Sequence, residues 1–254
     1  MQEKHHQKEF EVHYYEVNQY QEATPVSVLN YLEETAIAHS EAVGLGLNRL
    51  KSEGIAWVLN RWRVQMERYP RWNEKIIVET WPSHFERFYA TRQFYIKDIK
   101  GKILGRATSL WIFLNIEKKR PLRIPAEYML TYGLESQGVF EDPFSELYNL
   151  ENPEVFKEFY VRRSDIDTNE HVNNTKYMEW VLETVPTQIY KNHILQSFEV
   201  MYKKEVGLGS IISAASQPIE ELGKSTFAHT IKEKNQDYNL ALAKTCWVKR
   251  IKER

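Results

Sequence analysis

The sequence repeats itself, and this internal duplication limits the possible folds more than any other feature. Glu9-Phe10-x-Val12 recurs as Glu158-Phe159-x-Val161, and Glu34-Thr35 recurs as Glu183-Thr184. Both matches have the same separation of 149 positions, counted from 9 to 158 and from 35 to 184. A shared separation over several elements is typical of two copies of one structural unit.

A second match follows at a shorter separation. Leu59 to Pro82 has the apolar pattern of Leu195 to Pro218, 136 positions further on. The change from 149 to 136 predicts that the second copy has lost 13 residues after its helix.

Each copy is predicted to open with a short strand followed by a helix. Thr24-Pro25 gives an N-cap residue followed by proline at the first helical position, and Asn173 or Asn174 can cap the second helix. Apolar and small residues then recur at spacings of three and four, as on one face of a helix: Leu29, Leu32, Ala36, Ser40 and Val43 in the first copy, and Tyr177, Met178, Val181, Leu182 and Val185 in the second.

Strands are predicted after each helix, in segments rich in β-branched and aromatic residues. They are Trp57 to Met66, Ile76 to Trp81, Tyr89 to Ile96, Ala107 to Leu114, Leu195 to Tyr202, Ile211 to Ala215, Ser225 to Ile231 and Leu240 to Val248. Successive strands without helices between them pair antiparallel. We therefore predict an α+β chain of two hot-dog units, each one long helix wrapped by a curved antiparallel sheet.

Domain boundaries follow from the repeat and from a weakly periodic segment. Residues 131–157 contain Gly133, Gly138, Pro143 and Pro153 among acidic residues, which is typical of a linker. The chain of 254 residues then divides into an N-terminal domain at 1–130 and a C-terminal domain at 158–254.

The two copies differ most where the second contains a polar run from Arg162 to Asn174. Asp167, Asn169 and His171 stand opposite Asn18, Tyr20 and Glu22 of the first copy, respectively. If the segment is extended, the three side chains of the second copy project to one side. A carboxylate, an amide and an imidazole in this arrangement predict a catalytic site that the first copy lacks. Taken one at a time, the same residues also fit a polar turn in which Asp and Asn bond to backbone groups before a helix.

The run from Ser164 to Tyr177 resembles the signature S-D-x-D-x-N-x-H-V-N-N-x-K-Y of the plant and bacterial acyl-acyl carrier protein thioesterases. The resemblance extends over nearly the whole chain and includes Leu32-Glu33-Glu34-Thr35-Ala36, Arg68-Tyr69-Pro70-x-Trp72 and Ile124-Pro125. It implies hydrolysis of a fatty acyl-acyl carrier protein thioester to free fatty acid and holo-acyl carrier protein, which terminates fatty acid synthesis.

The resemblance also implies a fourth catalytic residue on a strand of the second domain. Tyr202-Lys203-Lys204-Glu205 fits the family pattern, so Glu205 joins Asp167, Asn169 and His171 as a candidate. Val206 stands where many plant members have a cysteine, and valine cannot attack a thioester. The one cysteine, Cys246, is predicted to be a buried structural residue.

Thioester hydrolysis needs a nucleophile, a base and a donor for the carbonyl oxygen. We expect Glu205 or Asp167 to activate water, with Asn169 and His171 orienting the reacting groups. Backbone amides at the start of the helix after Asn173 are expected to stabilise the oxyanion. Attack by Asp167 itself, through an acyl-anhydride, is left open.

Two larger sets of residues are expected to bind substrate. The resemblance assigns chain-length preference to the first domain, and the expected lining of its acyl tunnel is Leu32, Ala36, Trp57, Trp81 and Trp111. Acyl carrier protein is acidic, so the candidate docking residues are basic: Lys118, Lys119, Arg120, Arg162, Arg163, Lys203 and Lys204.

Composition excludes several other classes of protein. A net charge of -1 gives no overall attraction to nucleic acid, and no apolar run is long enough to span a membrane. A single cysteine and the absence of a secretion signal lead us to expect a cytoplasmic protein. Scattered histidines predict neither a metal site nor a cofactor, and either a monomer or a homodimer is expected.

Alternative functions remain open on the same fold. An acyl-coenzyme A thioesterase is the nearest, and dehydratases acting on hydroxyacyl thioesters also use this fold. A non-catalytic acyl-thioester sensor is a third alternative, although no basic helix-turn-helix segment is evident.

Overall fold

The computed structural model describes residues 5–142, 144–150, 153, 155–221 and 224–250. The chain forms two compact units, which divide between residues 143 and 144. This division falls within the segment predicted as a linker. Pro143, which was cited for that prediction, lies outside the described residues.

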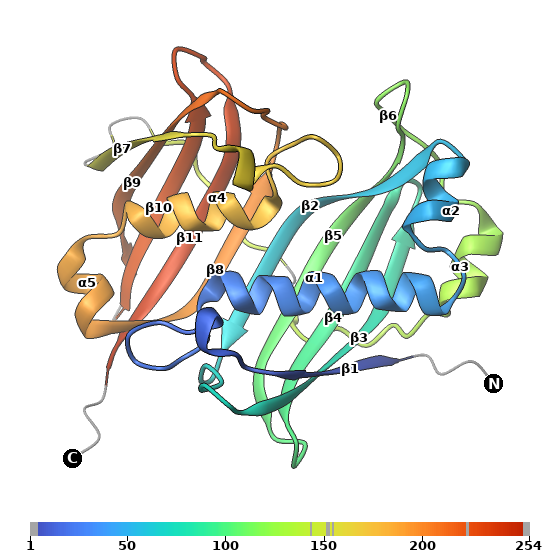
Figure 1. The fold of residues 1–254 in the computed structure, drawn as a ribbon, viewed down its shortest axis with the longest axis horizontal. Coiled ribbons are helices and arrows are strands. Elements are labelled where there is room, and N and C mark those ends of the chain that lie inside the picture. Colours follow the sequence, from blue (N-terminus) through green and yellow to red (C-terminus); the bar gives the residue numbers. More distant parts are fainter. Residues whose placement is uncertain (1–4, 143, 151–152, 154, 222–223, 251–254) are drawn as a thin grey trace. The chain divides into compact units, whose positions relative to one another are not determined.

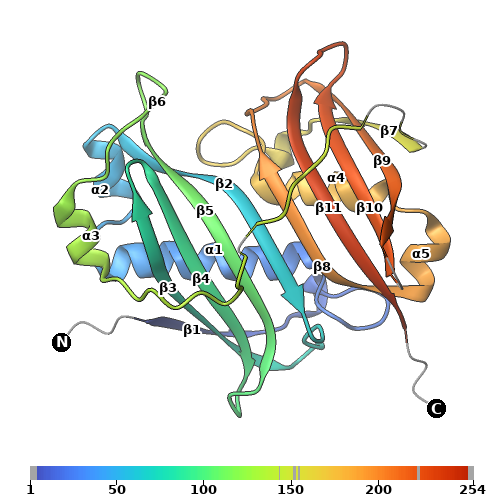
Figure 2. The same ribbon diagram turned by 180° about the vertical axis from the view of Figure 1, so that it is seen from behind.

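The first unit is a helix lying across one face of an antiparallel sheet (Figures 1 and 2). The sheet has the order β1-β3-β4-β5-β2, with the short β6 paired to β5. Its elements are β1 His6–Glu11, α1 Pro25–Ala42, α2 Leu47–Ser52, β2 Ile55–Met66, β3 Lys75–Glu86, β4 Tyr89–Asp98, β5 Ile103–Asn115, β6 Arg120–Pro121 and α3 Ala126–Tyr132.

The second unit repeats this arrangement, with α4 across a sheet of order β8-β11-β10-β9-β7. Its elements are β7 Val155–Tyr160, α4 Asn174–Glu183, α5 Thr187–Asn192, β8 His193–Tyr202, β9 Ile211–Glu221, β10 Lys224–Glu233 and β11 Asn239–Lys249. All eight predicted strands after the helices are present, and each is longer than predicted.

The predicted duplication is confirmed by the strand register. Phe10 of β1 pairs with Ile76 of β3, and Phe159 of β7 pairs with Ile212 of β9. The two phenylalanines are 149 positions apart and the two isoleucines are 136 positions apart, which are the two separations of the repeat. Each unit therefore has the same strand pairing as well as the same order of elements.

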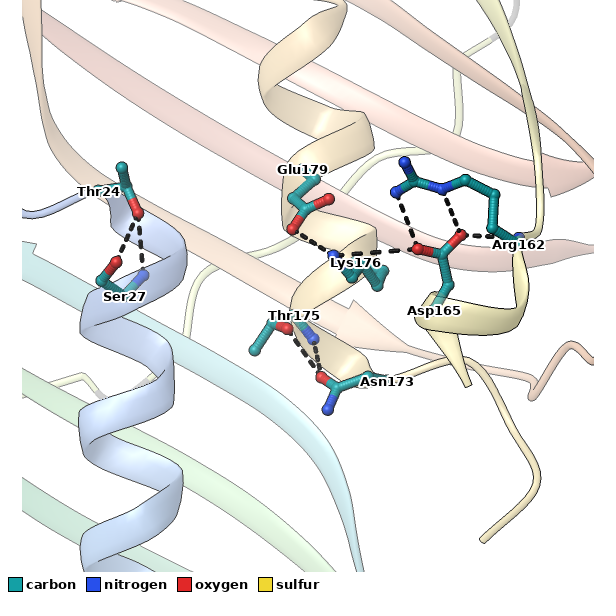
Figure 3. Close-up of polar contacts among 8 residues, drawn as sticks. All are labelled: Thr24, Ser27, Arg162, Asp165, Asn173, Thr175, Lys176 and Glu179. Carbon is teal, nitrogen blue, oxygen red and sulfur yellow. Dashed lines mark hydrogen bonds and ion pairs between the residues drawn. The ribbon is translucent and has the colours of Figure 1, made fainter. Parts of the chain in front are cut away.

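The two main helices begin as predicted but differ in length. Thr24 caps α1, with its side-chain oxygen accepting from the amide of Ser27, and Asn173 caps α4 in the same way through Thr175 (Figure 3). α1 has 18 residues and α4 has 10. Part of the 13-residue difference between the copies therefore lies in the length of the helix, and the loss in the second copy follows the end of its shorter helix, as predicted.

Large apolar side chains fill the space between helix and sheet in each unit. In the first they include Leu29 and Leu32 of α1 and Trp62 of β2, all fully buried. In the second, Met178 of α4 and Ile212 of β9 are fully buried. Burial of such side chains stabilises each by about 1.5 to 3 kcal/mol relative to exposure, so the helix is held mainly by packing.

The N-cap of α1 gives a prediction about stability. Replacing Thr24 with alanine removes the oxygen that satisfies the Ser27 amide and should lower the free energy of unfolding by about 1 kcal/mol. The exposed helix residue Asn30 provides a control, because Asn30→Ala removes no capping bond. Urea unfolding followed by tryptophan fluorescence would measure both variants, and unchanged stability of Thr24→Ala would contradict the assigned cap.

Candidate active site

Two of the four candidate catalytic side chains face each other in the second unit. The Nε2 atom of His171 lies 3.2 Å from a carboxylate oxygen of Glu205. The side chains are 34% and 47% exposed, so the pair is open to a substrate from solvent. An imidazole beside a carboxylate can exchange protons with a bound water or a leaving group.

Asp167, Asn169 and His171 lie in a tight turn, so the condition of an extended segment is not met and the alternative of a polar turn before the helix is the one observed. The amide of Asp167 donates to the carbonyl of His171 at 2.8 Å, and Glu170 has a positive φ of 63°. One carboxylate oxygen of Asp167 accepts from the amides of Asn169, at 2.8 Å, and His171, at 3.4 Å. The turn thus has its own hydrogen bonds, and alternation along a strand does not set the side-chain directions.

The first unit contains the same turn without the same chemistry. The side-chain oxygen of Asn18 accepts from the amides of Tyr20, at 2.8 Å, and Glu22, at 3.2 Å. Gln21 has a φ of 59°, close to that of Glu170. An amide oxygen and a carboxylate oxygen therefore close this turn equally well, and the charge of Asp167 is not needed for its shape.

Glu205 lies in a loop after β8, and the expectation of a strand position was wrong. The strand ends at Tyr202, and the amides of Lys203 and Lys204 both donate to the carbonyl of Leu240, at 2.8 and 3.2 Å. The amide of Val172 donates to the carbonyl of Val206 at 3.0 Å. This bond ties the loop to the end of the Asp167 turn and brings Glu205 to His171.

The structure relates the other two candidates to this pair less closely. The charges of Glu205 and Asp167 both act on the hydroxyl of Tyr177, so the two carboxylates lie near one buried phenol. Asn169 is exposed, and its amide donates to Asp167. The geometry therefore brings together His171 and Glu205, places Asp167 nearby, and leaves the Asn169 side chain exposed in the turn.

An ion-pair network around the buried Asp165, none of whose acidic members was among the candidate residues, supports the turn (Figure 3). Asp165 is 1% exposed and accepts from both the side chain and the amide of Arg162. Lys176 of α4 lies 3.9 Å from Asp165 and 2.7 Å from Glu179. Asp165 and Lys176 are fixed positions of the Ser164 to Tyr177 run, and this was the available sequence signal.

The expected oxyanion donors at the start of α4 are largely occupied. The amide of Thr175 donates to the Asn173 side chain at 2.9 Å, and the amide of Lys176 donates to the Asn173 carbonyl at 3.0 Å. Neither can donate to a substrate without breaking its bond. Stabilisation of the oxyanion by the first helical amides stays a prediction, to which Thr175 and Lys176 can contribute only by giving up these bonds.

Most of the expected tunnel residues share one face of the first unit. Leu32 and Ala36 of α1 are buried, and Trp57 and Trp111 pack against a buried cluster that includes Phe113 and Tyr132. These four remain candidates for contacts with an acyl chain.

Trp81 does not belong with the other tunnel residues. Its neighbour Thr80 bonds to Arg92, which contacts His39 of α1, so Thr80 faces the helix. Adjacent strand residues point to opposite faces, and Trp81 accordingly stacks on His5 with its indole nitrogen donating to the Gln137 carbonyl.

The face beneath α1 also contains a buried polar pair that the sequence analysis did not identify. The guanidinium of Arg92 lies 2.7 Å from the Nδ1 atom of His39. Burial, followed by the charge of Arg92, lowers the pKa of His39 to about 3, so the imidazole stays neutral and accepts. The layer between α1 and the sheet is therefore not wholly apolar.

The candidate docking residues are all exposed but fall in separate units. Lys118 and Lys119 lie in the turn before β6, and Arg120 lies in β6. In the second unit, Arg162 is engaged by Asp165 and Lys204 lies over the Tyr238 ring at 3.5 Å. The remaining two are Arg163 and Lys203, of which Lys203 is two residues before Glu205.

Three further expectations concern the cysteine, metal ligands and membrane-spanning helices. Cys246 is buried in β11, as predicted, and has no place in the site. Among the described residues, no group of three or more potential metal ligands comes together, and no helix has the length and apolarity needed to cross a membrane.

The sequence is similar to that of known proteins and to models of one protein family. The model of the acyl-ACP thioesterase N-terminal domain matches residues 3–132, and that of the C-terminal domain matches residues 148–249. An acyl-acyl-carrier-protein hydrolase of Cuphea viscosissima is 30% identical over 238 residues, covering 88% of this chain and 57% of the relative. A dodecanoyl-acyl-carrier-protein hydrolase of Cinnamomum camphora is 31% identical over 218 residues, covering 81% and 57%. The chain thus spans less than two thirds of these curated relatives.

Two solved structures match the fold of this chain over nearly their whole length. The 12:0-ACP thioesterase from Umbellularia californica has a TM-score of 0.87 and 27% identity, covering 98% of this chain and 99% of its own. An acyl-ACP thioesterase from Bacteroides thetaiotaomicron has a TM-score of 0.87 and 25% identity, covering 96% and 98%. The helix-on-sheet repeats are therefore those of a double hot-dog protein, an α+β fold. Within that class, the chain belongs to the acyl-ACP thioesterase family.

The Asp165 network predicts a pH-dependent contribution to stability. Burial alone would raise the pKa of Asp165, but the hydrogen bonds from Arg162 and the charges of Arg162 and Lys176 lower it overall. A lowered folded-state pKa stabilises the protein above the unfolded value of about 3.9, and this stability is lost as the pH falls through the folded value.

Asp165→Asn should therefore be less stable than the wild type at pH 7, by about 1 to 3 kcal/mol, with a smaller difference at pH 3. Urea unfolding at both pH values measures this, with the exposed Glu170→Gln as the control. An equal difference at both pH values would contradict the assigned role of the charge.

Proposed function

We propose that this protein hydrolyses the thioester of a fatty acyl-acyl carrier protein, releasing free fatty acid and holo-acyl carrier protein and so ending acyl-chain elongation. The observation that carries the proposal is the 3.2 Å contact between His171 and Glu205 beside the Asp167 turn. Membership of the acyl-ACP thioesterase family supports this choice of substrate, as do the hydrolase and thioesterase names of the relatives.

The proposed chemistry uses the carboxylates and the imidazole. Glu205 or Asp167 removes a proton from water, the oxygen attacks the thioester carbonyl carbon, and the tetrahedral intermediate expels the carrier thiolate. His171, held by Glu205, is placed to transfer the proton that the thiolate takes. Asn169, whose side chain is exposed, orients water or substrate.

A covalent route uses the same side chains. Asp167 attacks the carbonyl, expels the thiolate and forms an anhydride that water then hydrolyses. One oxygen of Asp167 closes the turn, so attack would use the other. Both routes fail without the carboxylates.

The remaining assignments divide substrate binding between the repeats. The first repeat holds the acyl chain through Leu32, Ala36, Trp57 and Trp111. The division of the chain into 1–130, a linker at 131–157 and 158–254 stays part of the proposal. Basic residues of both repeats dock the acidic carrier. A cytoplasmic monomer or homodimer remains part of the proposal, while the names of the plant relatives place those proteins in the chloroplast.

Replacement of the carboxylates tests the chemistry. Asp167→Asn should keep the turn, because Asn18 closes the equivalent turn, yet reduce kcat by at least about 100-fold. Glu205→Gln should have a similar effect. The matched control is Asn18→Asp, which makes the reciprocal change in the first repeat and should leave kcat unchanged. Release of carrier thiol measures all three variants, and near-normal turnover by both site variants would refute the assigned site.

A comparison of two carriers tests the substrate. Thiol release should be faster from an acyl-acyl carrier protein than from the same acyl group on coenzyme A, and the KM for the protein substrate should rise with salt as its charges are screened. Preference for coenzyme A would favour the alternative thioesterase. Binding without thiol release would favour the sensor, and a KM independent of salt would remove electrostatic docking.

A further inference from the structure

Two buried tyrosines connect α4 to the loop that contains Glu205. The hydroxyl of Tyr202, the last residue of β8, donates to the carbonyl of Asn174 at 3.1 Å. The hydroxyl of Tyr177, in the first half of α4, donates in the opposite direction to the carbonyl of Lys204 at 3.4 Å, at the long end of the hydrogen-bond range. The rings pack edge to face, with centroids 5.5 Å apart.

In the described part of the first repeat, the equivalent positions cannot make this connection. At the separations of 149 and 136, Tyr177 and Tyr202 correspond to Val28 and Met66, neither of which has a hydroxyl. Val28 and Met66 are both buried, so the first repeat fills the same space with apolar side chains. The position equivalent to Glu205 is Tyr69.

The backbone bonds of the two loops are otherwise the same. Glu67 and Arg68 donate to the carbonyl of Leu104 at 2.8 and 3.2 Å, as Lys203 and Lys204 do to Leu240. The amide of Ala23 donates to the carbonyl of Pro70 at 2.8 Å, as Val172 does to Val206. The fold therefore closes this loop without the tyrosines, and their hydroxyls occur only in the repeat that has the glutamate.

We propose that Tyr177 and Tyr202 are positioning residues, which act through the Lys204 carbonyl and the first turn of α4 to hold Glu205 against His171. The inference rests on the proposed hydrolysis and deepens it. The Lys204 carbonyl belongs to the peptide bond that precedes Glu205, so a bond to it restricts the backbone from which the carboxylate projects.

Burial and nearby negative charge keep the Tyr177 hydroxyl protonated, so it acts as a donor. Burial is the largest cause, and the negative charges of Glu205 and Asp167 add to it, raising the pKa of Tyr177 well above its usual value. The hydroxyl therefore stays protonated throughout the neutral range, and its bond to Lys204 does not depend on pH there.

Removing one oxygen at a time tests the positioning role. Tyr177→Phe and Tyr202→Phe keep the rings, and each should lower kcat about fivefold to tenfold while KM changes less than twofold. In a Glu205→Gln background the same changes should have almost no further effect on kcat, because the residue through which they act has gone. A purely structural effect would lower kcat by the same factor in both backgrounds.

The matched control is Tyr31→Phe in the first repeat, which removes a hydroxyl that donates to Glu16 at 2.8 Å. It should lower stability without lowering kcat. Unchanged kcat in both site variants, or an equal loss with and without Glu205, would overturn the positioning role while leaving the hydrolase intact. Absence of thiol release by the wild-type protein would instead overturn the proposed function.

Discussion

The hydrogen bond from the amide of Val172 to the carbonyl of Val206 brings together the two chain segments on which the candidate chemistry depends. One segment is a turn that ends at His171, and the other is a loop that begins after β8 and contains Glu205. They are far apart in sequence, and each side chain lies next to a residue of this bond. The 3.2 Å contact of imidazole and carboxylate follows from that closure.

The same closure occurs in both repeats, so it belongs to the fold and not to the reaction. Ala23 and Pro70 make the bond in the first repeat, and Asn18 closes the turn there. What differs is the set of side chains placed on a common backbone. Comparison of the repeats therefore separates residues that shape the loop from residues whose chemistry the loop presents.

Much of the architecture could be predicted because the same apolar pattern occurs in both copies of the repeat. The two separations predicted the duplication, which the equivalent pairing of Phe10 with Ile76 and of Phe159 with Ile212 confirms. Thr24 and the Asn173-Asn174 pair marked where the helices begin. The short helices α2, α3 and α5, of six or seven residues, were not predicted, since one or two turns carry too little periodicity to stand out.

The candidate site was harder to predict, because its geometry depends on backbone features with no simple pattern. Alternation suggested an extended segment, but Glu170 takes a left-handed φ and the chain turns back on itself. Glu205 lies past the end of its strand. Trp81 points away from α1, although its strand resembles that of Trp57 in composition. Strand face and strand end are set by register, which composition does not reveal.

The interchange of Asn18 and Asp167 has a consequence for how such a protein diversifies. A turn held by one side-chain oxygen accepts either an amide or an acid, so a copy can gain or lose a charge there without any rearrangement of its main chain. After duplication, one half can therefore change its charge at this position while both halves keep the same turn.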